Sequence, residues 1–311
     1  MDTPLVSIFT LAYNHAPFIR QCLDGILMQK TTFLFELIVH DDASTDETAD
    51  IIREYAARYP DIIKPVYETE NQFSKSDADF HLPEPQGKYT AWCEGDDYWT
   101  DPLKLQKQVD FLETHPDYTI CGGMCWIHKD GITEPPIEMK KISKGKTVTL
   151  QDYLDPHILY WLTVCYRNNS WKEERLDQFK RGIDIICYAI LLEQGKGFVL
   201  PDYFGVYRMH QGGIWAGNNY EQRLRFNEKY CYELVMHFGN KSKSIRKKYF
   251  KNSIDLRFFE LKTSQHIFSD GMKIVRFTFS GSIKDIISFQ IRYFFHMAKK
   301  SFKAYCKKRF N

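Results

Sequence analysis

An alternation of short apolar runs with amphipathic helical patterns constrains the fold of this chain more than any other feature. Residues 5–11 form a near-continuous apolar run, which is typical of a buried parallel strand. Pro17 follows and suits the first turn of a helix, and apolar residues then recur at helical spacing from Ile19 to Leu27. Strands that alternate with helices in this way predict a parallel sheet covered by helices.

Two further apolar runs continue the pattern. Residues 35–40 are predicted as a second strand and residues 62–67 as a third, in which Pro65 indicates an edge position. Between them, Ser44 and Glu47 have the spacing of a capping box, in which Ser44 would cap the helix that follows.

Three carboxylates stand within four residues, at Glu94, Asp96 and Asp97, directly after a fourth apolar run at 88–93. Like charges packed this tightly disfavour the folded state unless a cation is held among them. Mg²⁺ prefers one or two carboxylates together with substrate phosphate oxygens, so a metal bound to a phosphate is one explanation. A solvated acidic turn is the other explanation that this stretch leaves open.

Polar residues follow three of the predicted strands. Asn14 follows the first strand, Asp42 the second, and the acidic residues at 94–97 the fourth. Ligands of parallel sheets bind beyond the carboxyl ends of the strands, so we expect these groups to share one edge and to line a nucleotide cleft. The glycine-rich signatures of dinucleotide enzymes and P-loop NTPases do not occur in the sequence, which argues against both classes.

The composition is that of an ordinary globular protein, with 43% hydrophobic and 26% charged residues among 311. The N-terminus does not have the pattern of a signal peptide, and the sequence holds no run of about 18 uncharged apolar residues that would predict a membrane-spanning helix. The eight cysteines are scattered and lack zinc-site spacing, so we expect reduced, mostly buried thiols in a cytoplasmic protein.

Charge is distributed unevenly along the chain. Residues 1–215 hold 21 Lys and Arg against 33 Asp and Glu, whereas residues 216–311 hold 21 against 7. In the predicted helix at 282–311, apolar residues fall on one face and basic residues surround it, which favours an anionic membrane surface as a partner, here the inner face of the plasma membrane. A helix packed on the rest of the protein fits the pattern equally well. No nucleic-acid partner is expected, because the sequence holds no motif of a nucleic-acid-binding fold.

Taken in order, several motifs resemble family 2 glycosyltransferases. They are Val6 to Asn14, Asp41-Asp42-Ala43-Ser44, Gly87-Lys88-Tyr89, Glu94-Gly95-Asp96-Asp97, Gly182-Ile183-Asp184 and Val206-Tyr207-Arg208-Met209-His210, and they cover about residues 4–215. The resemblance implies an α/β GT-A fold, a Rossmann-like and mostly parallel sheet flanked by helices. Residues 1–215 would be the catalytic domain, with 1–117 as the nucleotide-sugar half and 118–215 as the acceptor half. Residues 216–311 would be a helical, basic C-terminal extension.

The same resemblance implies an activity of the bacterial polysaccharide type. A hexosyl or N-acetylhexosaminyl group would pass with inversion from a nucleotide-sugar, by expectation a UDP-sugar, to a glycan or lipid-linked acceptor, with Mg²⁺ or Mn²⁺ as cofactor. The residues carried over by match are Leu11, Ala12, Tyr13, Asn14 and Asp42 for the nucleotide, Asp96 for ribose and metal, Asp97 and His210 for the metal, Asp184 as catalytic base, and Glu94, Gly95 and Arg208 in support. Glu94 departs from the Asp that the family often has at its position.

Other interpretations remain open at this point. A nucleotidyltransferase would use the same metal carboxylates, although it would normally show a basic, glycine-rich phosphate loop near the N-terminus. A non-catalytic nucleotide-sugar-binding module would keep the fold with a degenerate site. By itself, Asp184 is also an ordinary acidic residue at a predicted helix start, where the helix dipole favours a carboxylate by about 0.3–1 kcal/mol and would keep it ionised. His210 by itself is an ordinary loop histidine.

Overall fold

The structure is a computed structural model, and it describes residues 3–72, 82–154, 157–170, 183–213, 217–239, 241–242, 244–246, 248–249, 252–253 and 255–256. Residues 1–252 form one compact unit and residues 253–311 a second. The predicted helix at 282–311 lies outside the described residues. The functional division of the chain at residue 215 stays a prediction.

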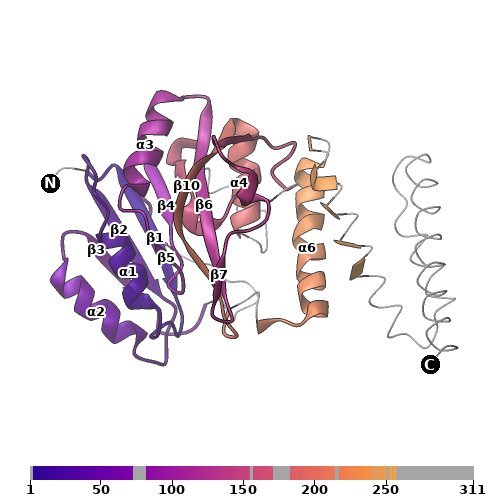
Figure 1. Cartoon of the computed structure of the whole chain (residues 1–311). Coiled ribbons are helices and arrows are strands. Elements are labelled where there is room, and N and C mark those ends of the chain that lie inside the picture. Colours follow the sequence, from indigo (N-terminus) through magenta and orange to yellow (C-terminus); the bar gives the residue numbers. More distant parts are fainter. Residues whose placement is uncertain are drawn as a thin grey trace, which may run out of the picture. The chain divides into compact units, whose positions relative to one another are not determined.

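A ten-stranded sheet forms the centre of the first unit (Figure 1). Its main path runs through β3 (Ile63–Tyr67), β2 (Phe35–Asp41), β1 (Val6–Ala12), β4 (Tyr89–Trp92), β9 (Cys165–Arg167), β6 (Tyr118–Lys129), β10 (Lys196–Met209) and β5 (Tyr98–Trp99). Beside this path, β7 (Ile132–Glu134) pairs with β6, and β8 (Lys146–Val148) pairs with β10. Strands β1 to β4 pair in parallel, and so do β6 and β10, while β9 joins the two groups by antiparallel pairing.

Helices cover both faces of this sheet, as the predicted α/β class requires. Helices α1 (Ile19–Leu27), α2 (Thr48–Arg58) and α3 (Lys104–Thr114) pack on one face, while α4 (Ile183–Gln194) packs on the other and carries α6 (Tyr220–Phe238). Strand β1 shows why both faces are covered, because Ile8 faces the first helical layer and Phe9 the second. Short 3₁₀ helices at Met139–Lys141, Trp161–Thr163 and Asn168–Ser170 lie among the connections.

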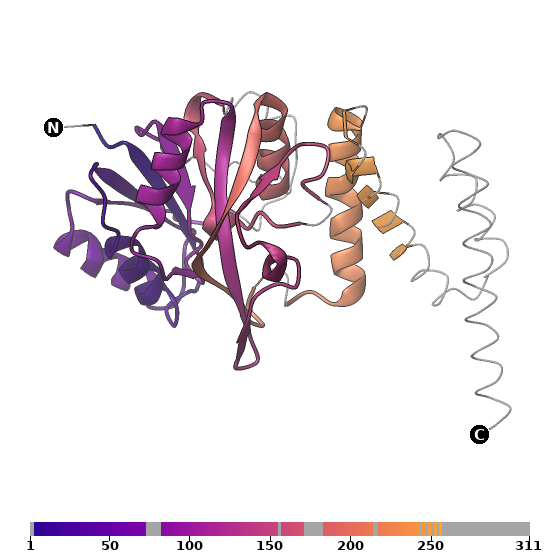
Figure 2. The ribbon, with the colours of Figure 1, turned by 45° about the horizontal axis from the view of Figure 1, so that its top comes forward.

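The four predicted N-terminal strands are confirmed to within one residue at each end, and β3 is an edge strand, as Pro65 indicated. Strand β10 is long and runs beside β6 (Figure 2). The two strands pair in parallel before and after Pro201, and their register is irregular between Val199 and Tyr203.

The predicted capping box at the start of α2 is wrong. The N-cap residue of the helix is Glu47, and Asp46 just before it accepts a hydrogen bond at Oδ1 from the backbone N–H of Thr48, at 3.0 Å. Ser44 Oγ instead accepts from the backbone N–H of Asn14 at 2.9 Å. Ser44 thereby ties the loop after β2 to the loop after β1, a tertiary contact that helix spacing cannot reveal.

A fully buried lysine fixes α3 against the sheet. Lys104 Nζ donates to Gln108 Oε1 at 2.8 Å and stands 4.0 Å from the ring centroid of Trp99 in β5. Gln108 in turn donates to the backbone oxygens of Cys121 and Thr163, each 2.7 Å away. Burial lowers the pKa of Lys104 to about 8.

We predict that Lys104→Met changes how stability depends on pH. The pKa of Lys104 is about 8 in the folded state and 10.5 ordinarily, so the unfolded state binds more protons between these values. The free energy of unfolding of the wild type should therefore rise through this range relative to the variant, by roughly 1–3 kcal/mol. Denaturant unfolding of both proteins at about pH 7.5 and pH 10 measures the difference. A difference that does not change with pH would contradict a lowered pKa of Lys104 in the folded state.

Candidate functional site

The loops after β1 and β2 lie side by side and hold each other. Asn14 adopts a left-handed backbone with φ 55°, and Ala43 does so with φ 58°. The N–H of Asn14 donates to Ser44 Oγ at 2.9 Å, and its Oδ1 accepts from the backbone N–H of Thr45 at 2.8 Å. Left-handed backbone is uncommon outside glycine, so these reciprocal bonds stabilise a conformation that the chain would otherwise disfavour.

The other predicted nucleotide-binding residues differ in how far solvent reaches their side chains. Tyr13 is 42% exposed, whereas Asp42 is buried and its Oδ1 accepts from the backbone N–H of Gln72 at 2.7 Å. The backbone oxygen of Leu11 accepts from Gly95, and that of Ala12 accepts from Asp42, each at 2.9 Å. Leu11 and Ala12 thus position their neighbours, and the ring of Tyr13 is the part that solvent reaches.

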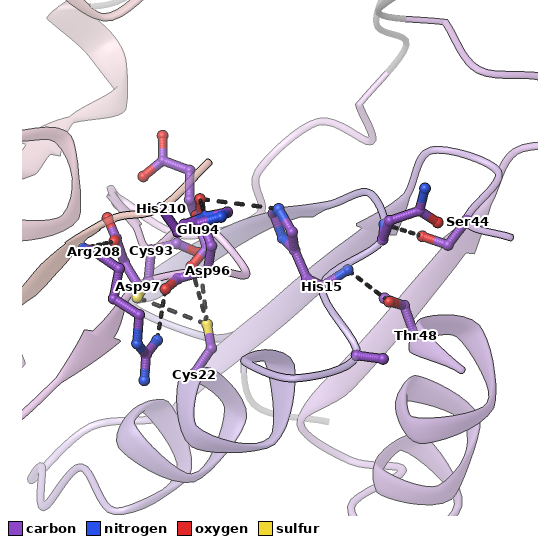
Figure 3. Close-up of polar contacts among 12 residues, drawn as sticks. His15, Cys22, Ser44, Thr48, Cys93, Glu94, Asp96, Asp97, Arg208 and His210 are labelled. Atoms are coloured by element: carbon purple, nitrogen blue, oxygen red, sulfur yellow. Dashed lines mark hydrogen bonds and ion pairs between the residues drawn. The ribbon is translucent and has the colours of Figure 1, made fainter. Parts of the chain in front are cut away.

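The acidic turn after β4 contains one buried and one partly exposed aspartate (Figure 3). Asp97 is 1% exposed, its Oδ1 accepts from the backbone N–H of Arg208 at 2.8 Å, and its Oδ2 is buried without a partner. Asp96 Oδ2 lies 3.0 Å from His210 Nε2 and 3.9 Å from His15 Nε2. Burial, reinforced by repulsion from neighbouring carboxylates, raises the pKa of Asp97 well above its usual range. Asp96 and His210 therefore meet, while Asp97 ties the turn to β10.

Arg208 holds the backbone of the same turn from β10. Its guanidinium donates to the backbone oxygen of Asp96 at 2.6 Å and also to Gln21 in α1. The guanidinium carbon stands 4.3 Å from the ring centroid of Tyr98 and 5.2 Å from that of Phe18. Through these contacts Arg208 connects β10 and α1 to the acidic turn. It therefore supports the site by contacts with the backbone and with aromatic rings.

Glu94 and Asp184 add two more carboxyl groups to this region. Asp184 lies in the first turn of α4, at the helix start where the sequence predicted it, and its Oδ1 accepts from the backbone N–H of Ile185 at 2.8 Å. Burial nevertheless raises the pKa of Asp184, so desolvation outweighs the stabilisation expected from the helix end. Burial and repulsion from Asp96 and Asp184 raise the pKa of Glu94 to about 8. Asp184 and the acidic turn therefore lie close enough for their charges to interact.

Sequence reasoning missed three residues that border the site. His15 faces Asp96, and burial lowers the pKa of its ring. Tyr188 is fully buried with a hydroxyl that has no partner, and the pKa of partly buried Tyr207 is raised by burial and by the nearby carboxylates. Signals existed, since His15 directly follows a motif residue, Tyr207 lies within a motif, and Tyr188 stands one helical turn after Asp184.

In the part of the chain that the structure describes, no group of three or more His, Cys, Asp or Glu side chains is arranged to hold a metal ion. The seven described cysteines are buried, as predicted. Among the described helices, none is long and apolar enough to cross a membrane.

Comparison with other sequences gives a family match over residues 7–165, to the model described as glycosyl transferase family 2. The uncharacterized protein Rv1520 of Mycobacterium tuberculosis is 36% identical over 227 residues, which are 72% of this chain and 64% of that protein. The match therefore spans less than two thirds of this relative. The putative teichuronic acid biosynthesis glycosyltransferase TuaG of Bacillus subtilis is 29% identical over 68% of this chain and 81% of its own length.

Solved structures share the fold. S. aureus TarS 1–349 superposes with a TM-score of 0.61 at 18% identity, over 87% of this chain and 78% of that one. The same TarS region has been solved with UDP-GlcNAc, with a TM-score of 0.54 over 81% of this chain and 80% of that one, at 17% identity. The mannosyltransferase PcManGT from Pyrobaculum calidifontis, in complex with GDP-Man and Mn2+, has a TM-score of 0.52 at 17% identity, over 96% and 81%. The expected GT-A fold is thereby confirmed.

We predict that Gly95→Ala disturbs the acidic turn more than it disturbs the fold. A Cβ at Gly95 would stand 2.7 Å from His15 Nδ1 and 3.1 Å from the backbone oxygen of Leu11, so the turn or the ring must move. Small displacements of the groups that contact a ligand weaken its binding. We therefore expect the affinity for nucleoside diphosphates, measured by calorimetry, to fall about tenfold or more.

Gly122→Ala is the matched control for that variant. The nearest atom to its Cβ would be the flexible end of Leu159, at 3.1 Å, so it should bind nucleoside diphosphates as the wild type does. Equal affinities of the Gly95→Ala variant and the wild type would show that close packing of His15 on the turn is not needed for binding.

Proposed function

The chain belongs to glycosyl transferase family 2, and on that premise we propose that it transfers a sugar from a nucleotide-sugar to a glycan or lipid-linked acceptor, with inversion at the anomeric carbon. One observation carries the proposal. The loops that hold Asn14 and Asp42, the Asp96–His210 contact and the Asp184 carboxylate gather at one edge of the sheet.

Two arguments support a nucleotide-sugar donor. TarS has been solved with UDP-GlcNAc and PcManGT with GDP-Man, so the shared fold accommodates such molecules. In this chain the exposed ring of Tyr13 and the interlocked loops at Asn14 and Ser44 offer a stacking surface beside a rigid wall. We propose a UDP-sugar that carries a hexosyl or N-acetylhexosaminyl group.

Asp96 and His210 fit a divalent metal that also binds the phosphates of the donor. Mg²⁺ commonly takes one or two protein carboxylates and completes its shell with phosphate and water oxygens, so few protein ligands suffice. Asp96 Oδ2 and His210 Nε2 already converge to 3.0 Å. Bound Mg²⁺ or Mn²⁺ would offset negative charge on the departing diphosphate. Asp97 as a further ligand stays a prediction, because its Oδ1 is engaged by Arg208 and its Oδ2 is buried.

Asp184 is suited to act as the general base. A pKa raised by burial makes its carboxylate a stronger proton acceptor than an ordinary aspartate. In the proposed step the acceptor hydroxyl gives its proton to Asp184 while its oxygen bonds to the anomeric carbon. The bond from that carbon to the diphosphate oxygen breaks, and the electron pair leaves with the nucleoside diphosphate. Attack opposite the leaving group inverts the configuration.

We propose the class of acceptor from the name of one relative. TuaG is named for teichuronic acid biosynthesis, which supports a cell-envelope polysaccharide as the acceptor class. The cytoplasmic placement stays an expectation, and placement on the inner face of the plasma membrane depends on residues 282–311. These lie outside the described residues, and the membrane partner stays a prediction.

A donor screen tests the activity. The protein is incubated with a panel of UDP- and GDP-sugars and Mn²⁺, and nucleoside diphosphate and sugar 1-phosphate are quantified. Release of a nucleoside diphosphate from one donor is the expected result. Formation of sugar 1-phosphate would instead indicate transfer of the nucleotidyl group, and donor binding without any turnover in the presence of acceptor glycans would indicate a binding module.

We predict that Asp184→Asn separates catalysis from donor binding. The amide fills the same space but cannot accept the proton, so kcat should fall by about a thousandfold while donor affinity stays within about threefold. Asp130→Asn, at an exposed hairpin turn with φ 51°, is the matched control and should retain full activity. Loss of donor binding in the Asp184→Asn variant would refute its role as base.

The pH profile provides a separate prediction. The base must be ionised, so activity should fall as pH decreases through the pKa of Asp184. Burial raises that pKa above 3.8. The pH at which kcat falls on the acidic side of the profile should therefore lie above the usual pKa of an aspartate. Steady-state rates at saturating donor and acceptor from about pH 4 to pH 9 measure it. An acidic limb at about pH 4 or below would contradict a buried base.

A further inference from the structure

We propose that His15 binds the diphosphate of the donor through its Nε2–H group, opposite His210. This inference rests on the proposed function and assigns His15 a role that the family motif does not give it. Figure 3 shows His15 reaching toward Asp96 from the loop after β1, while His210 approaches the same carboxylate. The two imidazole rings are nearly perpendicular, at 83°, with centroids 6.5 Å apart.

The position of His15 is fixed by its backbone. Its N–H donates to Thr48 Oγ1 at 2.8 Å, and its backbone oxygen accepts from Phe18 and Ile19 at 2.8 Å each as α1 begins. The next residue, Ala16, donates its N–H to Asp46 Oδ2 at 3.1 Å. The loop therefore presents the ring from a rigid base between α1 and α2, and little conformational entropy is lost when the ring binds a ligand.

Gly95 determines which edge of the ring faces the site. His15 Nδ1 is buried without a hydrogen-bond partner, and it lies so close to Gly95 that a Cβ there would be 2.7 Å away. The Cα–H of Gly95 that such a Cβ would replace points at Nδ1, and this contact suits an unprotonated nitrogen. The proton is then on Nε2, which points toward Asp96. This assignment of the tautomer follows from the contacts of the ring.

His15 Nε2–H has no hydrogen bond within the described residues. Its distance of 3.9 Å to Asp96 Oδ2 exceeds the hydrogen-bond range, whereas His210 Nε2 reaches the same oxygen at 3.0 Å. The side chain of His15 is 17% exposed, so a ligand can reach it. A polar group that is rigidly held, partly exposed and unpaired beside the binding carboxylate is available for a substrate atom.

The substrate atom that best suits the Nε2–H group of His15 is a phosphate oxygen. In the proposed function Asp96 and His210 hold the metal that the diphosphate binds, so diphosphate oxygens are the acceptors nearest to Asp96. A bond from N–H to a charged phosphate oxygen is stronger than one between neutral groups. A purely structural role would leave the polar edge of the imidazole without a function.

Calorimetry with UDP and GDP, and with UMP and GMP, tests the inference in the full-length protein. His15→Leu removes the donor, and we expect the affinity for the diphosphate that the wild type binds to fall about tenfold or more. The affinity for the matching monophosphate should stay nearly unchanged. His15→Gln places an amide N–H near the same position and should recover part of the loss. His128→Leu, which removes a histidine of β6 that contacts Thr133, is the control and should bind normally.

Repeating the titrations with Mn²⁺ and with EDTA separates direct from metal-mediated contact. A loss in both conditions supports contact between His15 and the diphosphate. A loss only with Mn²⁺ would overturn it in favour of metal ligation, and equal loss for monophosphate and diphosphate would overturn it in favour of a structural role. If the wild type binds none of these nucleotides, the proposed function itself fails. If the wild type binds and His15→Leu binds equally well, only the role of His15 fails.

Discussion

The bond from the backbone N–H of Arg208 to Asp97 Oδ1, at 2.8 Å, is the contact on which the rest of the site depends. The pairing of β5 with β10, at Tyr98–Val206 and Trp99–Gly205, already holds the chain after the acidic turn beside β10. Asp97 adds a side-chain bond at the turn itself, and the Arg208 guanidinium adds another by donating to the backbone oxygen of Asp96. With the turn and β10 held together, Asp96 Oδ2 and His210 Nε2 lie 3.0 Å apart.

This connection costs stability in the absence of a ligand. Asp97 is buried among other carboxylates, and its Oδ2 lacks a partner, which is the kind of arrangement that folding alone disfavours. Proteins retain such groups chiefly where function requires them. A cation that binds the donor's diphosphate at the edge of the turn would offset the repulsion between the carboxylates, so the unfavourable charge distribution of the free protein is itself an argument for a bound cation.

The strands, their order along the chain and the edge that carries the site could be predicted, because each depends on local apolar runs and on the general behaviour of parallel sheets. The direction of individual side chains could not. Ser44 has the spacing of a helix cap but bonds to Asn14 in another loop, and Asp97 turns inward to the backbone of β10 although Asp96 beside it turns to His210. His15 gains its orientation from Gly95, which lies 80 residues later. These features arise from contacts between distant segments, which sequence periodicity does not encode.

The central claim is that Asp96 and His210 gather a metal and a diphosphate at the carboxyl edge of the sheet. Pulsed electron paramagnetic resonance of Mn²⁺ in the presence of protein and UDP or GDP tests it most directly. The account predicts hyperfine coupling of the bound Mn²⁺ both to phosphorus-31 and to an imidazole nitrogen, and loss of the nitrogen coupling in His210→Gln. Mn²⁺ that shows coupling to neither nucleus, or nitrogen coupling that persists in His210→Gln and in His15→Leu, would contradict it.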